Sequence, residues 1–155
     1  MDAKSITVEG YLMDFGLNEI QREILDLSRT IFEDQVTPEK LASYDEYAVA
    51  RFDKDLWSKL AEAGLLSTCI DSDYGGSELG FMELALLLEE VGRSIAPVPL
   101  ASHCLSMMGI QKFGEKEIRK KILPEATSGN LLLTSAILEP MNNNPMSTHS
   151  TSFVF

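Results

Sequence analysis

Few side chains in this sequence combine the type and spacing that chemistry requires. The two histidines, His103 and His149, lie far apart, and neither has a cysteine or carboxylate at the spacing of metal ligands. Glu89 and Glu90 resemble an acid and base pair, but neighbouring helical residues point about 100° apart, so the two cannot face one substrate. The sequence therefore predicts no metal site, and we expect both glutamates on the surface.

A cluster of positive charge is the one feature that could attract an anionic ligand. Five of the 13 basic residues lie close together in the sequence, at Lys112, Lys116, Arg119, Lys120 and Lys121. Such a cluster can bind a phosphate group. The alternative is a solvated helix surface, because Glu115 and Glu117 are each spaced one turn from a basic residue and could form ion pairs.

Composition excludes several classes of partner. A chain of 155 residues that is 45% hydrophobic can bury one core without disulfides or metal. Its net charge of -11 argues against nucleic acid or an anionic membrane as the main partner, since both are polyanions. No apolar run approaches the roughly 20 residues that span a bilayer. The start of the chain lacks the apolar core of a secretory signal, and only two cysteines occur, so we expect a cytoplasmic protein.

The elements that position these residues are helices, and three polar residues mark where the first of them begin. Asn18, Thr37 and Asp53 are residue types that cap a first turn, and Pro38 suits the first helical position. The helix after Asp53 should end at Gly64, which can adopt the left-handed conformation.

The apolar stretch Phe81–Ile95 predicts a central core helix, because its apolar stripe is too wide for a helix buried on one side only. Pro97 and Pro99 then interrupt the helical pattern, since each removes a backbone donor. The next helix starts at Leu100 and is expected to end at Gly114.

The last helix is predicted over Glu115–Ile122 and is closed by Pro124. Residues 131–138, LLLTSAIL, are the one good strand candidate, although no neighbouring strand is apparent. Residues 141–155 are polar and rich in Asn and Ser, which predicts a disordered tail.

These patterns predict an all-α fold: an orthogonal helical bundle of about five to six helices, followed by one orphan β-strand and a disordered tail. The expected organisation is an irregular segment over residues 1–16, a helical domain over 17–130, the start of a β-domain over 131–140 and the tail over 141–155.

Several stretches together resemble a known family. They are LAEAGLL from Leu60, DYGG from Asp73, ELALLLEEVGRSIAPVPL up to Leu100, and GIQKFGEKEIRKKILPEATSGNLLLTSAILEP from Gly109 to Pro140. They resemble the amino-terminal helical domain of acyl-CoA dehydrogenases and the first strand of their flavin-binding middle domain. The resemblance stops at Pro140, which makes the chain similar to a truncated member.

The resemblance implies a flavoprotein of lipid metabolism, such as fatty acid oxidation, with FAD as cofactor and acyl-CoA as partner. In that family a glutamate removes the proton next to the thioester while the flavin accepts a hydride. The resemblance places that glutamate in a part that this sequence does not contain, so no residue here is assigned as catalytic.

The family's wall for the acyl chain falls, by position, on Leu100, Ala101, Cys104, Leu105 and Met108. The alternative is that these are ordinary core residues, because apolar positions at helical spacing usually are.

The resemblance also places Ile137 and Leu138 where backbone groups face FAD. Leu138 stands where the family usually has a threonine, and the alternative is a pair of strand residues that bind nothing.

Two functions follow. The first is an acyl-CoA dehydrogenase-like flavoprotein fragment that belongs to a homo- or hetero-oligomer. The second is a non-catalytic helical interaction subunit, or a degenerate truncated relative, which packs against another chain.

Overall fold

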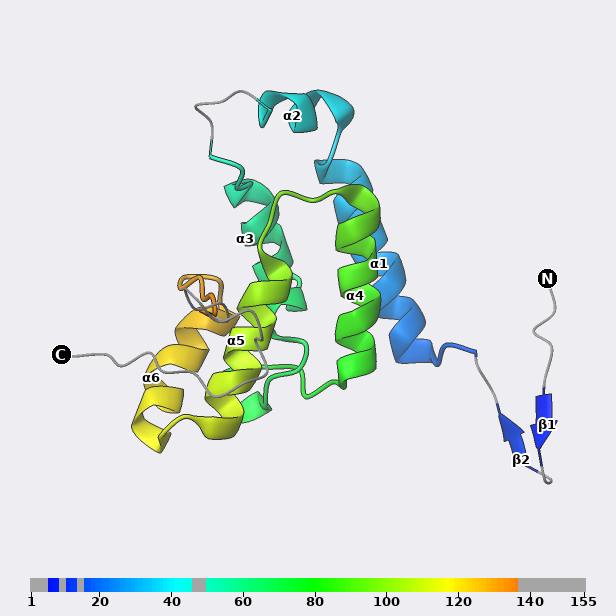
Figure 1. Ribbon diagram of the computed structural model, residues 1–155, viewed down its shortest axis with the longest axis vertical. Helices are drawn as coiled ribbons and strands as arrows, with labels where there is room; N and C mark the ends of the chain where they lie inside the picture. The colour runs from blue at the N-terminus through cyan, green and yellow to red at the C-terminus, as the bar shows by residue number, and fades with distance from the viewer. Residues whose placement is uncertain (1–5, 9–10, 14–15, 46–49, 137–155) are drawn as a thin grey trace, which may run out of the picture.

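Local capping determines where the first helices begin. The computed structural model describes residues 6–8, 11–13, 16–45 and 50–136, and Figure 1 shows its elements in order. Helix α1, Glu19–Gln35, starts with a capping box in which Asn18 and Gln21 exchange hydrogen bonds of 2.8 and 3.0 Å. Thr37 caps α2, Pro38–Ser43, and Asp53 caps α3, Lys54–Glu62. All three predicted helix starts are confirmed.

Three further helices complete the bundle. They are α4, Phe81–Ser94, α5, Leu100–Phe113, and α6, Lys116–Thr127. Two short 3-10 turns, η1 at Leu65–Ser67 and η2 at Ser72–Tyr74, join α3 to α4. The described part of the chain therefore contains six α-helices, and the predicted all-α fold is confirmed.

The helices pack in two neighbouring groups. Helices α1 and α4 lie side by side and run in the same direction, whereas α5 packs against α6 beside η1 (Figure 1). One core fills the space between them, and the following large side chains in it are fully buried: Phe32, Leu56, Leu60, Leu66, Ile70, Leu84, Leu87, Leu100, Met107 and Leu123.

Helix α6 extends further than the sequence predicted. The prediction ended it before Pro124, yet the helix passes through Pro124 and stops at Thr127. A proline in a helix removes one backbone hydrogen bond. The buried side chains of Leu123 and Ala126 lie on either side of it, so packing of this last turn offsets the missing bond.

The predictions for the two ends of the chain need correction. Residues 131–136 form no strand, because the described chain offers no neighbouring strand to pair with them. The remainder of the predicted strand, with Ile137 and Leu138, and the tail over 141–155 lie outside the described residues. Within the segment 1–16 that we expected to be irregular, β1, Ile6–Val8, pairs antiparallel with β2, Tyr11–Met13.

Two negative findings hold for the described residues. None of their helices combines the length and the apolar character that crossing a membrane needs. No three histidine, cysteine or acidic side chains among them are grouped as a metal site would require.

Candidate functional site

Helix α5 divides the five residues that we assigned to the acyl wall into two sets. Leu100 and Cys104 point into the core and are at most 3% exposed. Ala101, Leu105 and Met108 lie on another face of the helix, because they follow one another at intervals of four and three residues. Ala101 and Leu105 are exposed, and Met108 is half-buried. The structure thus brings only three of the five to a surface where a ligand has access.

A shallow apolar hollow of about 450 Å³ lies beside Leu105. Its lining comes from α5, the start of α6 and the segment after α6, and consists of Leu105, Ser106, Gly109, Ile110, Phe113, Gly114, Ile118, Leu133, Thr134 and Ser135. Three of these apolar side chains are strongly exposed: Leu105 at 47%, Phe113 at 80% and Ile118 at 47%. Exposed apolar side chains grouped around a hollow are typical of a surface that binds another apolar group.

The segment after α6 forms one side of this hollow, and two hydrogen bonds hold it against α5. The hydroxyl groups of Ser106 and Ser135 are 2.6 Å apart. The backbone N–H of Leu133 donates to Nδ1 of His103 over 3.1 Å. Sequence reasoning identified neither contact, because each joins residues about 30 positions apart that only the packing of α5 and α6 brings together.

Cys104 has the properties of an inert core residue. Its Sγ donates to the carbonyl oxygen of Leu66 over 3.4 Å. Burial raises the pKa of this thiol to about 12, with a smaller contribution from Cys69. A thiol that stays protonated at neutral pH is a poor nucleophile and metal ligand.

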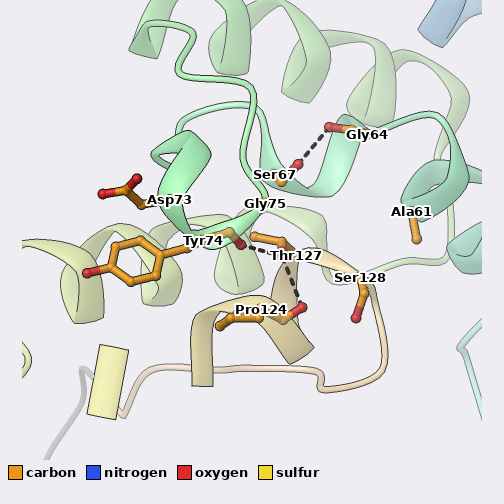
Figure 2. A pocket seen from close by; sticks show the side chains of 9 residues that line it. All are labelled: Ala61, Gly64, Ser67, Asp73, Tyr74, Gly75, Pro124, Thr127 and Ser128. Carbon is orange, nitrogen blue, oxygen red and sulfur yellow. Dashed lines mark hydrogen bonds between the residues drawn. The ribbon is translucent and has the colours of Figure 1, made fainter. Parts of the chain in front are cut away.

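The DYGG turn forms a second, polar hollow that Figure 2 shows from close by. The Thr127 hydroxyl lies 2.9 Å from the carbonyl oxygen of Tyr74 and 3.0 Å from that of Pro124, which ties the turn to the end of α6. Gly75 adopts a φ of 83°, in the left-handed region. A Cβ at Gly76 would lie 1.9 Å from the carbonyl oxygen of Ile70, so only glycine fits there. The role of this turn is conformational.

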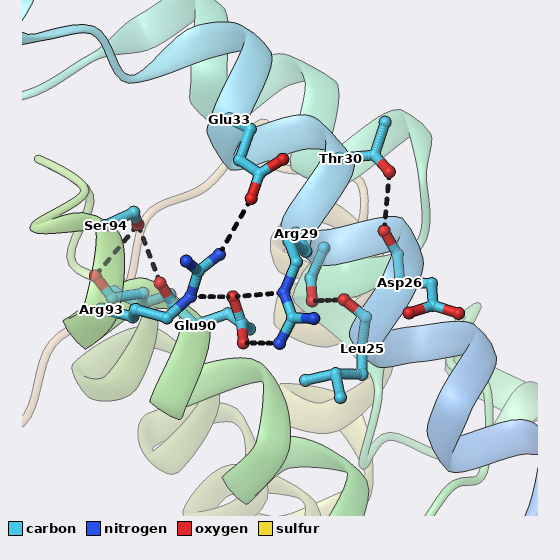
Figure 3. A network of polar contacts seen from close by, with 10 residues as sticks. Leu25, Asp26, Arg29, Thr30, Glu33, Glu90, Arg93 and Ser94 are labelled. Atoms are coloured by element: carbon cyan, nitrogen blue, oxygen red, sulfur yellow. Dashed lines mark hydrogen bonds and ion pairs between the residues drawn. The ribbon is translucent and has the colours of Figure 1, made fainter.

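Glu90 corrects one of our predictions, since it lies buried and not on the surface. Its carboxylate accepts a hydrogen bond from Nη2 of Arg29 at 2.9 Å and another from Nε of Arg93 at 2.7 Å (Figure 3). Arg93 also reaches Glu33 on α1 at 3.4 Å. The hydrogen bond from Arg29 is the main reason that the pKa of Glu90 is lowered, although burial opposes it. This network forms because α1 packs against α4, and the sequence alone does not reveal that the two helices are neighbours.

The basic cluster on α5 and α6 does not form the ion pairs that the spacing indicated. Neither Glu115 with Arg119 nor Glu117 with Lys121 is among the ion pairs of the described chain. Lys112 places its Nζ 5.4 Å from the centre of the Phe113 ring, next to the hollow. The edge of the hollow therefore carries positive charge.

The residues that we assigned to the flavin lie outside the described part of the chain. The two residues assigned to FAD, Ile137 and Leu138, follow the last described residue, Ala136.

Comparison with known proteins shows which family has this helical arrangement. The family model described as the acyl-CoA dehydrogenase N-terminal domain matches residues 18–130. The chain belongs to the acyl-CoA dehydrogenase family. A curated relative, the acyl-CoA dehydrogenase FadE27 of Mycobacterium tuberculosis, is 33% identical over 140 residues, which cover 90% of this chain and 37% of that protein.

Solved structures agree with the family. The ChsE4–ChsE5 complex from Mycobacterium tuberculosis matches with a TM-score of 0.77 at 31% identity, over 85% of this chain and 36% of the other. PigA with FAD and proline matches with a TM-score of 0.65 at 26% identity, over 77% and 32%. The chain thus spans about a third of the length of the relatives that it matches.

Proposed function

We propose that this chain is the amino-terminal helical part of an acyl-CoA dehydrogenase and that its exposed α5 face forms one wall of the acyl site. In this role the chain supplies binding surface, while the catalytic base belongs to a part of the family that this sequence does not contain. FAD, when bound, would supply the hydride acceptor. The matched PigA structure that holds FAD supports a flavin in this family.

The observation that carries the proposal is the apolar hollow beside Leu105. It combines three strongly exposed apolar side chains with an open shape and with Lys112 at its edge. An acyl chain matches the apolar lining, and the phosphate groups of coenzyme A match the positive edge. Of the five residues assigned from the sequence, Leu105 lines the hollow itself.

A binding measurement on the full chain tests this proposal. Isothermal titration with a medium-chain acyl-CoA and with free coenzyme A should show tighter binding of the thioester. Replacement Leu105→Glu should weaken acyl-CoA binding about tenfold, because it places a charge in the apolar hollow.

The matched control is Leu27→Glu, since Leu27 is exposed to a similar degree, 44%, but lies on α1 outside the hollow. Equal losses in both variants, or equal affinity for acyl-CoA and coenzyme A, would contradict an acyl wall at this place. In parallel, visible absorbance of the chain after addition of FAD and desalting shows whether the chain itself retains the flavin.

A second candidate function is that of a non-catalytic interaction subunit. Ile20, Phe81 and Met82 are each about half exposed or more, and they lie where α1 and α4 both begin. The hydrogen bond from Gln21 to Glu83, 2.9 Å, shows that these two helix ends meet. An apolar surface of this kind fits a homo- or hetero-oligomer, and one matched structure is itself a complex of two named proteins.

Sedimentation of the chain over a range of concentrations tests the second candidate. The double replacement Phe81→Ser and Met82→Ser should shift an associating chain to monomer, whereas Phe113→Ser, at a more exposed site beside the apolar hollow, should not. A chain that stays monomeric at every concentration would remove the support for self-association.

A further inference from the structure

His103 is completely buried in α5, and among the described residues it belongs to no group of side chains that could hold a metal ion. Its ring packs edge-on against Trp57 of α3, with centroids 4.8 Å apart and planes at 79°. A buried imidazole must satisfy both ring nitrogens, because an unpaired polar atom in the core costs free energy.

The partners of the two ring nitrogens determine where the proton is. Nε2 lies 3.1 Å from the carbonyl oxygen of Ala126, which can only accept a hydrogen bond, so Nε2 carries the proton. Nδ1 lies 3.1 Å from the backbone nitrogen of Leu133, which can only donate, so Nδ1 is without a proton. Both contacts are satisfied only by the neutral ring with its proton on Nε2.

These two hydrogen bonds join three separate parts of the chain. Ala126 belongs to the last turn of α6, His103 to α5, and Leu133 to the segment that lines the apolar hollow. Trp57 holds the turn that connects Ala126 to Leu133, because its Nε1 donates to the carbonyl oxygen of Gly129 over 3.0 Å. The two packed rings therefore hold the chain at Ala126, Gly129 and Leu133.

We propose that His103 is a positioning residue: in its neutral Nε2–H form it holds the segment Leu133–Ser135 against α5 and so fixes one side of the apolar hollow. The inference rests on the proposed function only for what the hollow binds. The hydrogen-bonded arrangement of the ring is a property of the chain alone. No charged side chain makes a hydrogen bond or ion pair with this ring in the described part of the chain.

Two amide replacements, each of which reproduces one of the ring nitrogens, separate the two hydrogen bonds. In His103→Asn the side-chain Oδ1 takes the place of Nδ1 and still accepts from Leu133. In His103→Gln the side-chain Nε2 takes the place of the ring Nε2 and still donates to Ala126, but no acceptor remains for Leu133. Both variants lose the ring that packs on Trp57, so they serve as controls for each other's loss of packing.

Hydrogen exchange of the Leu133 amide is the deciding measurement. We expect exchange about tenfold faster in His103→Gln than in His103→Asn, in line with the loss of one hydrogen bond. Equal exchange in the two variants would overturn the proposal, because a role in packing alone affects both alike.

Nitrogen-15 spectra of the imidazole in the unmodified chain provide a test that needs no variant. The proposal requires a protonated Nε2 and an unprotonated Nδ1 at neutral pH, and a proton on Nδ1 would overturn it.

Titration of the same variants with acyl-CoA then connects the position of the segment to the hollow. Weaker binding in His103→Gln than in His103→Asn is expected. If exchange at Leu133 differs as expected but neither the variants nor Leu105→Glu changes binding, the acyl wall is wrong and the positioning role of His103 for the segment stands.

Discussion

The α1–α4 pair and the α5–α6 pair are held together by different polar contacts. Between α1 and α4, a buried carboxylate on Glu90 meets two arginines, and a second carboxylate on Glu33 extends the network. Between α5, α6 and the segment that follows, His103 and Ser106 make uncharged hydrogen bonds beside an open apolar surface, and Arg119 of α6 donates to the carbonyl oxygen of Gln111 over 3.4 Å. Ion pairs therefore join the two helices that act as a frame, whereas no ion pair of the described chain joins α5 to α6.

This contrast predicts that mutations in the frame lower stability and that mutations at the hollow lower binding. Leu87 on α4 is fully buried, and Leu87→Ala should lower the free energy of unfolding by about 3 kcal/mol because it opens a cavity. Leu105→Ala should change it by less than about 0.5 kcal/mol, since that side chain is half exposed. Urea denaturation of both variants measures the difference, and equal losses would abolish the distinction between the two regions.

Removal of the buried charge should have the next largest effect. Glu90→Gln should cost roughly 2 kcal/mol of stability, because two charge-assisted hydrogen bonds are weakened while both arginines can still reach water. Glu89→Gln is the matched control, since the neighbouring side chain is exposed and belongs to no ion pair in the described chain. A loss of the same size in the control would show that the network contributes nothing specific.

The pH dependence of stability should separate the two regions by their different titrating groups. Burial lowers the pKa of His103, partly offset by its hydrogen bond to Ala126, so the unfolded chain binds the proton more tightly than the folded chain. Stability should therefore be constant above about pH 6.5 and fall below it, by at most about 1.4 kcal/mol per pH unit from this group.

The ring of His103 is faced by Trp57 and by the backbone at Ala126 and Leu133, and the neighbouring Cys104 thiol stays neutral in this range. Glu90, whose pKa is lowered, contributes stability that is lost only at more acidic pH, below about 4.5. Thermal unfolding of His103→Gln from pH 7 to about pH 3 should lack the first decline and keep the second. A first decline that persists in this variant would assign it to another group.

The smallest expected effect concerns the link between the two regions. Ile95 ends α4 with a φ of 54°, a left-handed conformation that a β-branched residue rarely adopts. Ile95→Gly should therefore raise the free energy of unfolding by about 1 kcal/mol, whereas Ile95→Val should leave it nearly unchanged. Chemical denaturation of the two variants gives the comparison, and a destabilised glycine variant would mean that contacts of the exposed Ile95 side chain outweigh its backbone strain.

The sequence predicted those parts of the fold that depend on neighbours along the chain. Caps at Asn18, Thr37 and Asp53 act within one helical turn, so residue type and spacing were sufficient. The end of α6 was wrong because burial of Leu123 and Ala126, and not local propensity, determines where that helix stops.

The candidate site was only partly predictable for the same reason. Helical spacing alone separates Ala101, Leu105 and Met108 from Leu100 and Cys104, so that division could have been made from the sequence. The partners of Glu90 and His103 could not, because Arg29 lies 61 positions from Glu90 and Leu133 lies 30 positions from His103. Such contacts depend on how whole helices pack.

The edge-on contact between Trp57 and His103 gives this protein a spectroscopic reporter. Trp57 is its single tryptophan, so the intrinsic fluorescence of the indole comes from one site. A protonated imidazole quenches an adjacent indole more strongly than a neutral one. The fluorescence intensity of the unmodified chain thus follows the ionisation of His103, and an optical titration can report on the attachment of the segment beside the hollow without any label.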